Sequence, residues 1–213
     1  MSRRLSRRQF LLAAMGTGAG LSAIHAKVGN ARMAKNPFIT LEKPRVVRRP
    51  DLPADLMEFY SKHEVDPKAS LVYLNFTPLD KVKLLGLKEI GIDVDLLPDA
   101  LRAEWAKFSG LLVAYDSFGD EIVYVTKAPS CAPGSIMVLG GDVSGPGGTG
   151  PLACDLTLVL AASFTKWLAH LKRWDWIDYG VIPGGIKDLP AADRDELHKY
   201  YLGLNPQITW AKA

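Results

Sequence analysis

The sequence is poor in the residues on which most enzyme and metal sites depend. Among its 213 residues there are only two cysteines and four histidines. The histidines stand in no HExxH arrangement and at none of the cysteine and histidine spacings of a zinc site. No serine lies in a GxSxG turn, and no Lys-Ser or Lys-Thr pair marks a P-loop. The sequence therefore lacks a complete nucleophile, metal or phosphate motif, and we expect no cofactor.

Long apolar runs are missing as well. A membrane-spanning helix needs about 20 mainly apolar residues. The charge-free stretch at residues 10–24 is shorter and is rich in glycine, alanine and serine. Basic residues precede this stretch and small residues follow it, which is the layout of a removable export signal. The sequence thus predicts a signal peptide and no stable membrane span after processing. The basic residues are Arg3, Arg4, Arg7 and Arg8.

Two adjacent arginines specify the kind of signal. Arg7 and Arg8 are followed closely by Phe10 and Leu11, an order that resembles the twin-arginine motif. Such a motif is an address that a receptor reads, and it does not anchor the chain. We therefore expect the twin-arginine export machinery to deliver the protein to the periplasm or beyond. The alternatives are a basic amphipathic N-terminus and an uncleaved anchor.

Cleavage of the signal is expected after Ala26 or Ala31. Gly29 and Ala31 put small residues at positions −3 and −1, so Ala31 is preferred. Residues 1–31 carry five basic residues and no acidic one. Of the 26 basic residues, 21 then remain against 23 acidic ones, a formal net charge of −2. This balance argues against a nucleic-acid partner, which requires a basic surface.

The remainder of the chain divides into a lead-in and one domain. Prolines and cations punctuate residues 32–50 and predict an extended linker. Residues 51–213 suit a single domain, because domains commonly hold about 100–150 residues. Apolar periodicity predicts helices within residues 51–63, 98–110, 163–174 and 188–202. Short runs rich in Val, Ile and Tyr predict strands at 111–116, 121–127 and 135–141, with less regular candidates at 71–76 and 152–160.

This order of elements indicates an α+β fold. The three clearest strands follow one another through short turns, which is typical of an antiparallel meander. We expect an antiparallel β-meander of three to five strands packed against helices.

Three carboxylates cluster at the predicted tip of a hairpin. Asp116, Asp120 and Glu121 belong to the run YDSFGDEI. Turn formation in water is one interpretation, because aspartate is common in turns. Acid–base chemistry is a second, if a pocket separates the pKa values of paired carboxylates. As a third, we consider the three residues candidate charged contacts for a protein partner.

Aromatic residues gather in the run RWDWIDYG. Trp174 and Trp176 either close the core at the end of a helix or form an exposed anchor for a partner, because binding hot spots are rich in tryptophan. If they share a helix end, we expect one of them to face the core.

The two cysteines, Cys131 and Cys154, flank the same strand-and-loop unit. In an oxidising compartment they are candidates for a disulfide that closes a loop of about 24 residues. Two buried free thiols are the alternative, because cysteine is also a good small core residue.

Three short segments resemble the SUKH superfamily, the fold of Smi/Knr-type cell-wall assembly regulators and of many toxin-immunity proteins. They are LPADLMEFY (52–60), FGDEIVYV (118–125) and LAASFTKWL (160–168). They resemble, in that order, the opening helix of the family, its Gly-Asp hairpin and the start of a later helix. The resemblance spans about residues 51–176. It implies a SUKH-like domain that binds a protein partner and catalyses no reaction.

Two functions thus compete for this chain. The first is an exported, non-enzymatic binding module, with a partner in the cell envelope. The second is a periplasmic enzyme or a cofactor-handling accessory protein, because twin-arginine export often carries proteins that are folded around cofactors. The missing cofactor motif favours the first.

Overall fold

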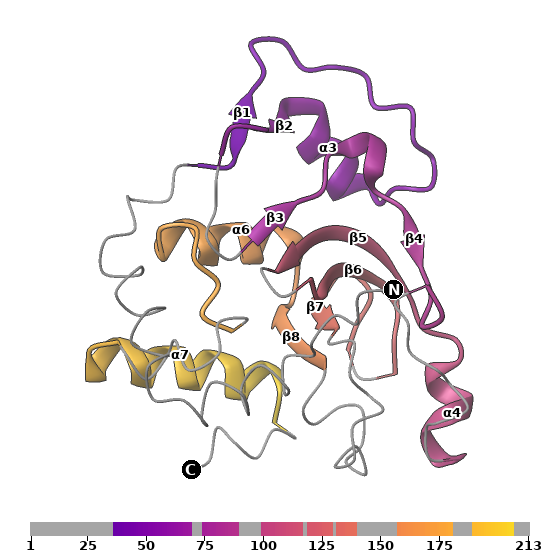
Figure 1. Cartoon of the computed structure of the whole chain (residues 1–213), viewed down its shortest axis with the longest axis vertical. Helices are drawn as coiled ribbons and strands as arrows, with labels where there is room; N and C mark the ends of the chain where they lie inside the picture. Colours follow the sequence, from indigo (N-terminus) through magenta and orange to yellow (C-terminus); the bar gives the residue numbers. More distant parts are fainter. Residues whose placement is uncertain are drawn as a thin grey trace, which may run out of the picture.

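Helices and antiparallel strands make up the part of the chain that the structure describes (Figure 1). The structure is a computed structural model, and it describes residues 36–69, 74–89, 99–116, 119–129, 131–139, 157–180 and 189–206. The strands are β1 (Phe38–Thr40), β2 (His63–Val65), β3 (Leu74–Phe76), β4 (Leu84–Leu85), β5 (Ser109–Asp116), β6 (Glu121–Lys127), β7 (Ile136–Leu139) and β8 (Thr157–Ala161). The helices are α3 (Ala54–Lys62), the 3-10 turn η1 (Leu79–Lys81), α4 (Asp99–Trp105), α6 (Phe164–Arg173) and α7 (Ala191–Leu204).

The central sheet is a meander with a divided edge. From β5 to β8 each strand pairs antiparallel with the next one along the chain. Both β3 and β4 pair antiparallel with β5, one at each end of it. A separate two-stranded sheet pairs β1 with β2. The predicted α+β class is confirmed, since antiparallel strands pack with helices.

Both faces of the central sheet are buried, and the strand sequences show why. Along β6, Ile122 and Tyr124 belong to one apolar cluster, whereas Val123 and Val125 belong to another. Successive side chains of a strand point to opposite faces of the sheet. A strand that is covered on both faces therefore reads as a continuous apolar run, as β5 to β8 do.

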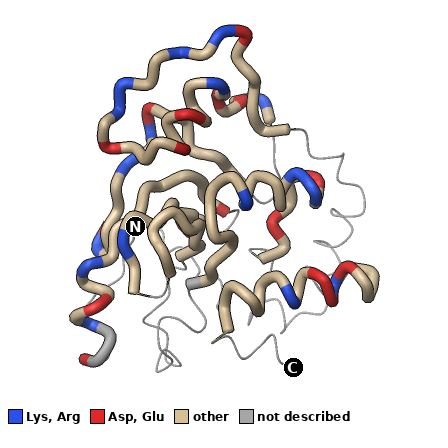
Figure 2. The backbone as a smooth tube through the Cα atoms, turned by 180° about the vertical axis from the view of Figure 1, so that it is seen from behind, with Lys and Arg blue, Asp and Glu red and all other residues tan. Residues whose placement is uncertain are grey.

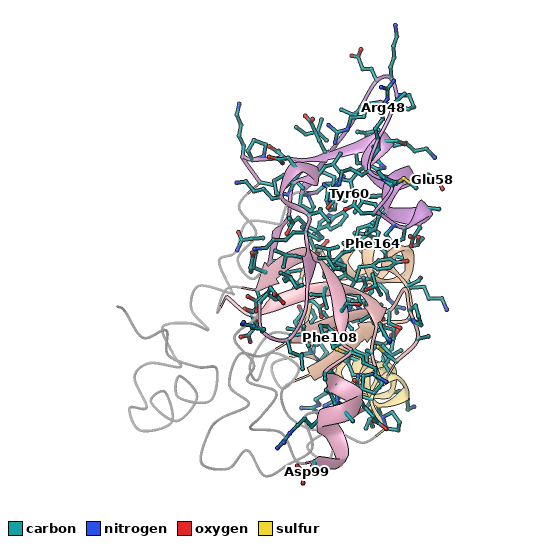
Figure 3. All side chains as sticks on the ribbon, turned by 90° about the vertical axis from the view of Figure 1, so that its right-hand side faces the viewer. Arg48, Glu58, Tyr60, Asp99, Phe108 and Phe164 are labelled. Carbon is teal, nitrogen blue, oxygen red and sulfur yellow. The ribbon has the colours of Figure 1, made fainter. Side chains whose placement is uncertain are left out.

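Helices α3, α6 and α7 cover the first face and complete the larger cluster. Trp105 and Phe108, at and just after the end of α4, contribute to the smaller cluster on the second face. In Figure 3, Tyr60 and Phe164 lie in the crowded interior, whereas Arg48 lies at the edge of the molecule. Fully or nearly fully buried side chains of the three covering helices are Leu56, Tyr60, Phe164, Trp167, Leu171, Leu197 and Tyr201.

Helix α6 begins and packs as its sequence predicts. The hydroxyl of Ser163 accepts a hydrogen bond from the backbone N–H of Lys166 at 3.2 Å, which satisfies one otherwise unpaired N–H of the first turn. Phe164, Trp167 and Leu171 then recur at helical spacing and are 2% exposed or less. Their burial fixes which face of the helix meets the sheet.

The outer edge of β8 is closed by a side chain. The backbone N–H of Val159 donates to Oδ1 of Asn205 at 2.7 Å, and Nδ2 of Asn205 donates to the carbonyl oxygen of Val159 at 2.9 Å. The same Nδ2 donates to the carbonyl oxygen of Tyr201 in the last turn of α7, at 3.0 Å. Asn205 thus replaces a neighbouring strand and ends α7, which protects an edge that otherwise invites pairing with another chain.

Phe38 of β1 lies in the expected linker, yet it is a core residue. It is 7% exposed. Its ring meets the rings of Phe59, Phe76 and Trp176 edge-on, with centroids 4.8, 4.6 and 5.9 Å away. Such pairs add to the free energy gained by burial.

Residues 41–50, which we call the strap, continue from β1 without helix or strand. The backbone N–H of Leu41 donates to the carbonyl oxygen of Lys62, and that of Arg45 donates to the carbonyl oxygen of Ser61, both at 2.8 Å. The described part of the expected linker, residues 36–50, is therefore fastened to the folded unit that we expected to begin at residue 51. The rest of that linker lies outside the described residues.

Within the described ranges, no helix combines the length and the apolar character that crossing a membrane requires.

Candidate functional site

A pocket of about 520 Å³ opens between the strap, β2 and the turn that carries η1. Charged side chains of both signs surround it, and apolar side chains complete its wall. Its lining residues are Arg45, Arg49, Glu64, Val65, Pro78, Leu79 and Asp80.

Arg45 is held in place by backbone carbonyl groups. Its Nε donates to the carbonyl oxygen of Tyr60 at 2.9 Å, and its Nη2 donates to that of His63 at 3.3 Å. The remaining nitrogen, Nη1, lies 3.8 Å from Oε2 of Glu64. The side chains of this pair are 39% and 45% exposed, so water screens their attraction.

The guanidinium of Arg49 makes more hydrogen bonds than that of Arg45. Its Nε and Nη2 donate to the two carboxylate oxygens of Asp51 at 2.8 and 2.6 Å. Its Nη1 donates to the carbonyl oxygen of Leu79 at 3.1 Å, and Nη2 donates also to that of Val82 at 2.9 Å. The hydrogen bond with Asp51 raises the pKa of Arg49 and lowers that of Asp51. Arg49 therefore ties the strap to the turn at η1.

The two arginines differ in what they can offer a ligand. A bidentate carboxylate and two carbonyl oxygens occupy the guanidinium of Arg49. Arg45 has two carbonyl partners and only a long, exposed contact with Glu64. The pocket can accept a small group that is partly apolar and carries a negative charge.

The hairpin between β5 and β6 buries two of the three predicted carboxylates. Asp116 is 3% exposed and Asp120 is 8% exposed. Oδ1 of Asp116 accepts the backbone N–H of Asp120 at 2.9 Å, and the backbone N–H of Asp116 donates to the carbonyl oxygen of Asp120 at 3.0 Å. Both contacts hold the turn together, so the structure favours the turn interpretation. Buried carboxylates are poorly placed for the surface contacts that we expected.

Glu121, the third residue of this group, is half-buried at the start of β6. It pairs in register with Tyr115 on β5 and with Leu139 on β7. A role for Glu121 in binding stays a prediction.

Trp174 and Trp176 follow α6, and both are half-buried against the larger core cluster. The guanidinium carbon of Arg173 lies 5.6 Å from the centre of the Trp174 ring, and Tyr179 meets that ring edge-on at 5.7 Å. Trp176 meets Phe38. These contacts favour closure of the core over an exposed anchor, and they do not divide the pair into one inner and one outer residue as we expected.

The turn after α6 has an unusual backbone. Asp175 and Trp176 have φ angles of 51° and 64°, which residues other than glycine rarely adopt. The N–H of Trp176 donates to the carbonyl oxygen of Leu171 at 2.5 Å and closes the helix. This turn directs the next residues back into the protein, and Asp178 becomes fully buried.

Asp178 accepts hydrogen bonds at both carboxylate oxygens. Oδ2 accepts Nε1–H of Trp167 at 2.6 Å. Oδ1 accepts the hydroxyl of Tyr201 at 2.5 Å and the backbone N–H of Gly180 at 2.9 Å. A Cβ atom at Gly180 would lie 2.6 Å from Cζ of Tyr201, so glycine permits this close approach. We call Asp178, Trp167, Tyr201 and His170 the buried network.

His170 completes this network. Its Nε2 lies 3.2 Å from the hydroxyl oxygen of Tyr201, whose only proton is given to Asp178, so Nε2–H is the donor. His170 is 9% exposed, and its ring stacks on that of Tyr200 with the ring centres 4.7 Å apart. Burial lowers the pKa of His170, against the opposing effect of Asp178. Burial therefore favours a neutral imidazole.

Several predicted residues cannot be placed. The signal residues Arg7, Arg8, Phe10 and Leu11 lie outside the described residues, and so does Cys154. Cys131 is half-buried and packs against the smaller apolar cluster. The disulfide and the signal therefore stay predictions.

Sequence patterns indicated neither polar site of the structure. The strap arginines lie in a segment with the composition of a linker, and Asp178 lies in an aromatic run. An aspartate between Trp176 and Tyr179 was a usable signal, because an apolar stretch buries its polar members only when they are hydrogen-bonded. The pocket had no such signal, because its walls come from segments far apart in the chain.

In the part of the chain that the structure describes, no three His, Cys, Asp or Glu side chains gather as a metal site requires. Comparison with known proteins found no matching family model, no matching curated protein and no matching solved structure.

Proposed function

We propose that this chain is an exported, non-enzymatic binding protein with a SUKH-like fold, and that the pocket beside the strap receives part of a protein partner. The observation that carries the proposal is the pocket itself. Its wall combines an arginine held by two carbonyl oxygens with apolar side chains. A preorganised wall of this kind lowers the entropic cost of binding.

The resemblance to SUKH proteins supports the same proposal. Of the three segments that carry it, 52–60 covers most of α3 and 160–168 runs from the end of β8 into α6. The described part of the third, residues 119–125, lies just before and along β6. Proteins of that superfamily bind other proteins, and the proposal extends this property to the present chain.

The buried network gives catalysis little support. Asp178 is fully buried and its two oxygens accept three hydrogen bonds, while Tyr201 is 2% exposed. A substrate could reach these groups only if the packing around them opened. We therefore assign the network to stability and the pocket to binding.

Blocking the pocket tests the proposal. Asp80 is an exposed lining residue, and Lys83 is an exposed neighbour outside the lining. We expect Asp80→Trp to lose a partner that the wild-type protein captures from the native envelope, and Lys83→Trp to retain it. Thermal unfolding of each variant shows whether it is folded. A tightly bound cofactor or metal in the purified protein, without a captured partner, would instead favour a periplasmic enzyme or a cofactor-handling accessory protein.

Export is tested separately. We expect replacement of Arg7 and Arg8 by lysine to retain the precursor in the cytoplasm, because the twin-arginine receptor reads the arginine pair. Replacement of Arg3 and Arg4 by lysine is the matched control, since it changes the same residue type outside the motif. Cell fractionation followed by immunoblotting measures both. Normal delivery of the Arg7 and Arg8 variant would exclude this route.

A further inference from the structure

We infer that the pocket recognises an acidic segment of the partner, and that Arg45 binds its carboxylate in place of Glu64. This inference rests on the proposed function and names the chemistry of the partner. The bound segment presents one carboxylate to Arg45 and an apolar side chain to Val65, Pro78 and Leu79.

Arg45 is suited to this role because its position is already fixed. The bonds from Nε to Tyr60 and from Nη2 to His63 orient the guanidinium before any ligand arrives. Nη1 is directed to the side of Glu64, which also lines the pocket. An incoming carboxylate therefore meets an oriented donor, and little side-chain entropy is lost on binding.

Glu64 is a weak internal competitor for the same donor. Its Oε2 lies 3.8 Å from Nη1 of Arg45, beyond the length of a hydrogen bond, and both side chains are substantially exposed. Such a pair contributes little, so a better placed carboxylate can displace it. Arg49 cannot take this role, because Asp51 already fills its fork at 2.8 and 2.6 Å.

The surroundings of the pocket also favour an acidic partner. Within the strap the four cations Lys43, Arg45, Arg48 and Arg49 outnumber the single acidic residue, Glu42. On the pocket wall, Asp80 is a second carboxylate beside Glu64, and it is exposed to solvent. Figure 2 shows blue positions spaced along the strap at the top of the molecule. Val46, between these cations, is 81% exposed. Positive charge beside a partly apolar surface attracts acidic segments and raises their association rate.

A pair of short peptides tests the inference. The probe is the N-acetylated, C-amidated pentapeptide GVEVG, and its control is GVQVG, which has the same shape and no charge. Backbone amide shifts of residues 62–66 and 78–82 are followed by NMR during titration of the mature protein. We expect the acidic peptide to bind about tenfold more tightly, which corresponds to one charge-assisted hydrogen bond.

Variants of the pocket identify the carboxylate donor. Glu64→Gln removes the competitor without touching Arg45, so we expect it to tighten binding of the acidic peptide several-fold. Arg45→Gln should abolish the preference for the acidic peptide. Lys43→Gln removes the same charge at an exposed position and should change affinity only slightly, and less at high salt.

The outcomes separate this inference from the proposed function. Equal affinity for the two peptides, or no effect of Glu64→Gln, overturns the inference even if Arg45→Gln also disturbs the strap. A captured partner that depends on the pocket but is indifferent to Glu64→Gln leaves the function standing and refutes the acidic segment. Clear discrimination between the peptides without any captured partner supports the pocket chemistry and refutes the proposed function.

Discussion

The two polar sites of this protein, the pocket beside the strap and the buried network, differ in how their charged groups are stabilised. In the buried network, Asp178 is fully buried and accepts three hydrogen bonds. In the pocket beside the strap, Arg45 and Glu64 are substantially exposed, and Nη1 of Arg45 lies 3.8 Å from Oε2 of Glu64, beyond the length of a hydrogen bond. Every partner of Asp178 comes from the protein, whereas the pocket leaves a charged donor that water or a ligand can share.

This contrast in burial distinguishes polar groups that stabilise the fold from polar groups that a ligand can reach. A buried charge must be fully hydrogen-bonded, because its desolvation otherwise costs several kcal/mol. Such a group is fixed by the fold and is not available to a ligand. A charge at the surface can exchange its partner at small cost, so function is more readily sought there.

The largest expected effect is at Asp178. We expect Asp178→Ala to destabilise the protein by about 5 kcal/mol, because it leaves the buried donors of Trp167 and Tyr201 without their acceptor and removes one of the two acceptors of the Gly180 N–H. Asp178→Asn retains oxygen and shape and should cost less. Asp195→Ala, at an exposed position of α7, is the matched control and should change stability little. Urea denaturation measures all three, and a small loss for Asp178→Ala would break the comparison.

The next largest loss of stability is expected at Phe38 in β1, just before the strap. We expect Phe38→Ala to cost about 3 kcal/mol, because it removes a buried ring that three other rings contact. Val46→Ala should cost almost nothing, since Val46 is 81% exposed. The two residues are eight positions apart in the sequence, so the contrast tests whether the expected linker belongs to the fold. Thermal unfolding measures the loss of stability of each variant. Equal losses would show that residues 36–50 are a linker outside the fold.

A smaller effect depends on pH. Burial lowers the pKa of His170 below the ordinary value of 6.5, with Asp178 and Glu196 opposing the shift and Arg173 adding to it. The folded protein therefore binds fewer protons than the unfolded chain as the pH falls below 6.5. Stability is complete above that pH and decreases below it, down to the folded pKa, by at most about 1.4 kcal/mol per pH unit.

Replacement of His170 by asparagine tests this dependence. We expect the variant to be less stable at neutral pH and to lose part of the decrease below pH 6.5. Urea denaturation at several pH values gives the two curves. The ring of Tyr200 and the hydroxyl of Tyr201 also contact His170, but burial raises the pKa of Tyr200 to about 12 and that of Tyr201 well above 10, so neither titrates in this window. Parallel curves for the two proteins would contradict the assignment.

The smallest effect is a difference between two substitutions at Trp176. Its φ of 64° is favourable only for glycine, so we expect Trp176→Gly to be about 1 kcal/mol more stable than Trp176→Ala. At Trp174, where φ is −105°, the order should reverse, because glycine there only adds freedom to the unfolded chain. Chemical denaturation of the four variants gives the order of stability at each position. The same order at both positions would show that strain at this turn is unimportant.

The local elements were largely predictable from the sequence. Ser163 and the spacing of Phe164, Trp167 and Leu171 predicted α6, and the observed helix begins at Phe164. The run EIVYVTK predicted a strand at 121–127, and β6 occupies those residues. In contrast, no strand was predicted at residues 84–85, which form β4 shortly after the turn η1. Pairing with β5 decided that segment, since an edge strand depends on its neighbour more than on its own propensity.

The sites were less predictable, for a physical reason. Asp116 and Asp120 were expected at an exposed tip, but both are buried, and Oδ1 of Asp116 accepts the backbone N–H of Asp120 within the turn. Arg45 belonged to a segment that lacks apolar periodicity, so no local pattern indicated that it would be held against α3 and β2. Sequence patterns record the burial of apolar faces and carry little information on which distant polar groups will meet.

The sequence by itself determined the α+β class, the meander and the apolar faces of its helices, because side-chain periodicity and capping act within a few residues. The tertiary structure alone decided that Phe38 and the strap join the fold. It also decided that Asp178 is buried beneath α6 and α7, and that Arg45 and Glu64 share a pocket. These outcomes depend on contacts between residues far apart in the chain, such as the 23 positions between Asp178 and Tyr201. Whether a charge is buried or shared with water is set by such contacts and by the desolvation they impose.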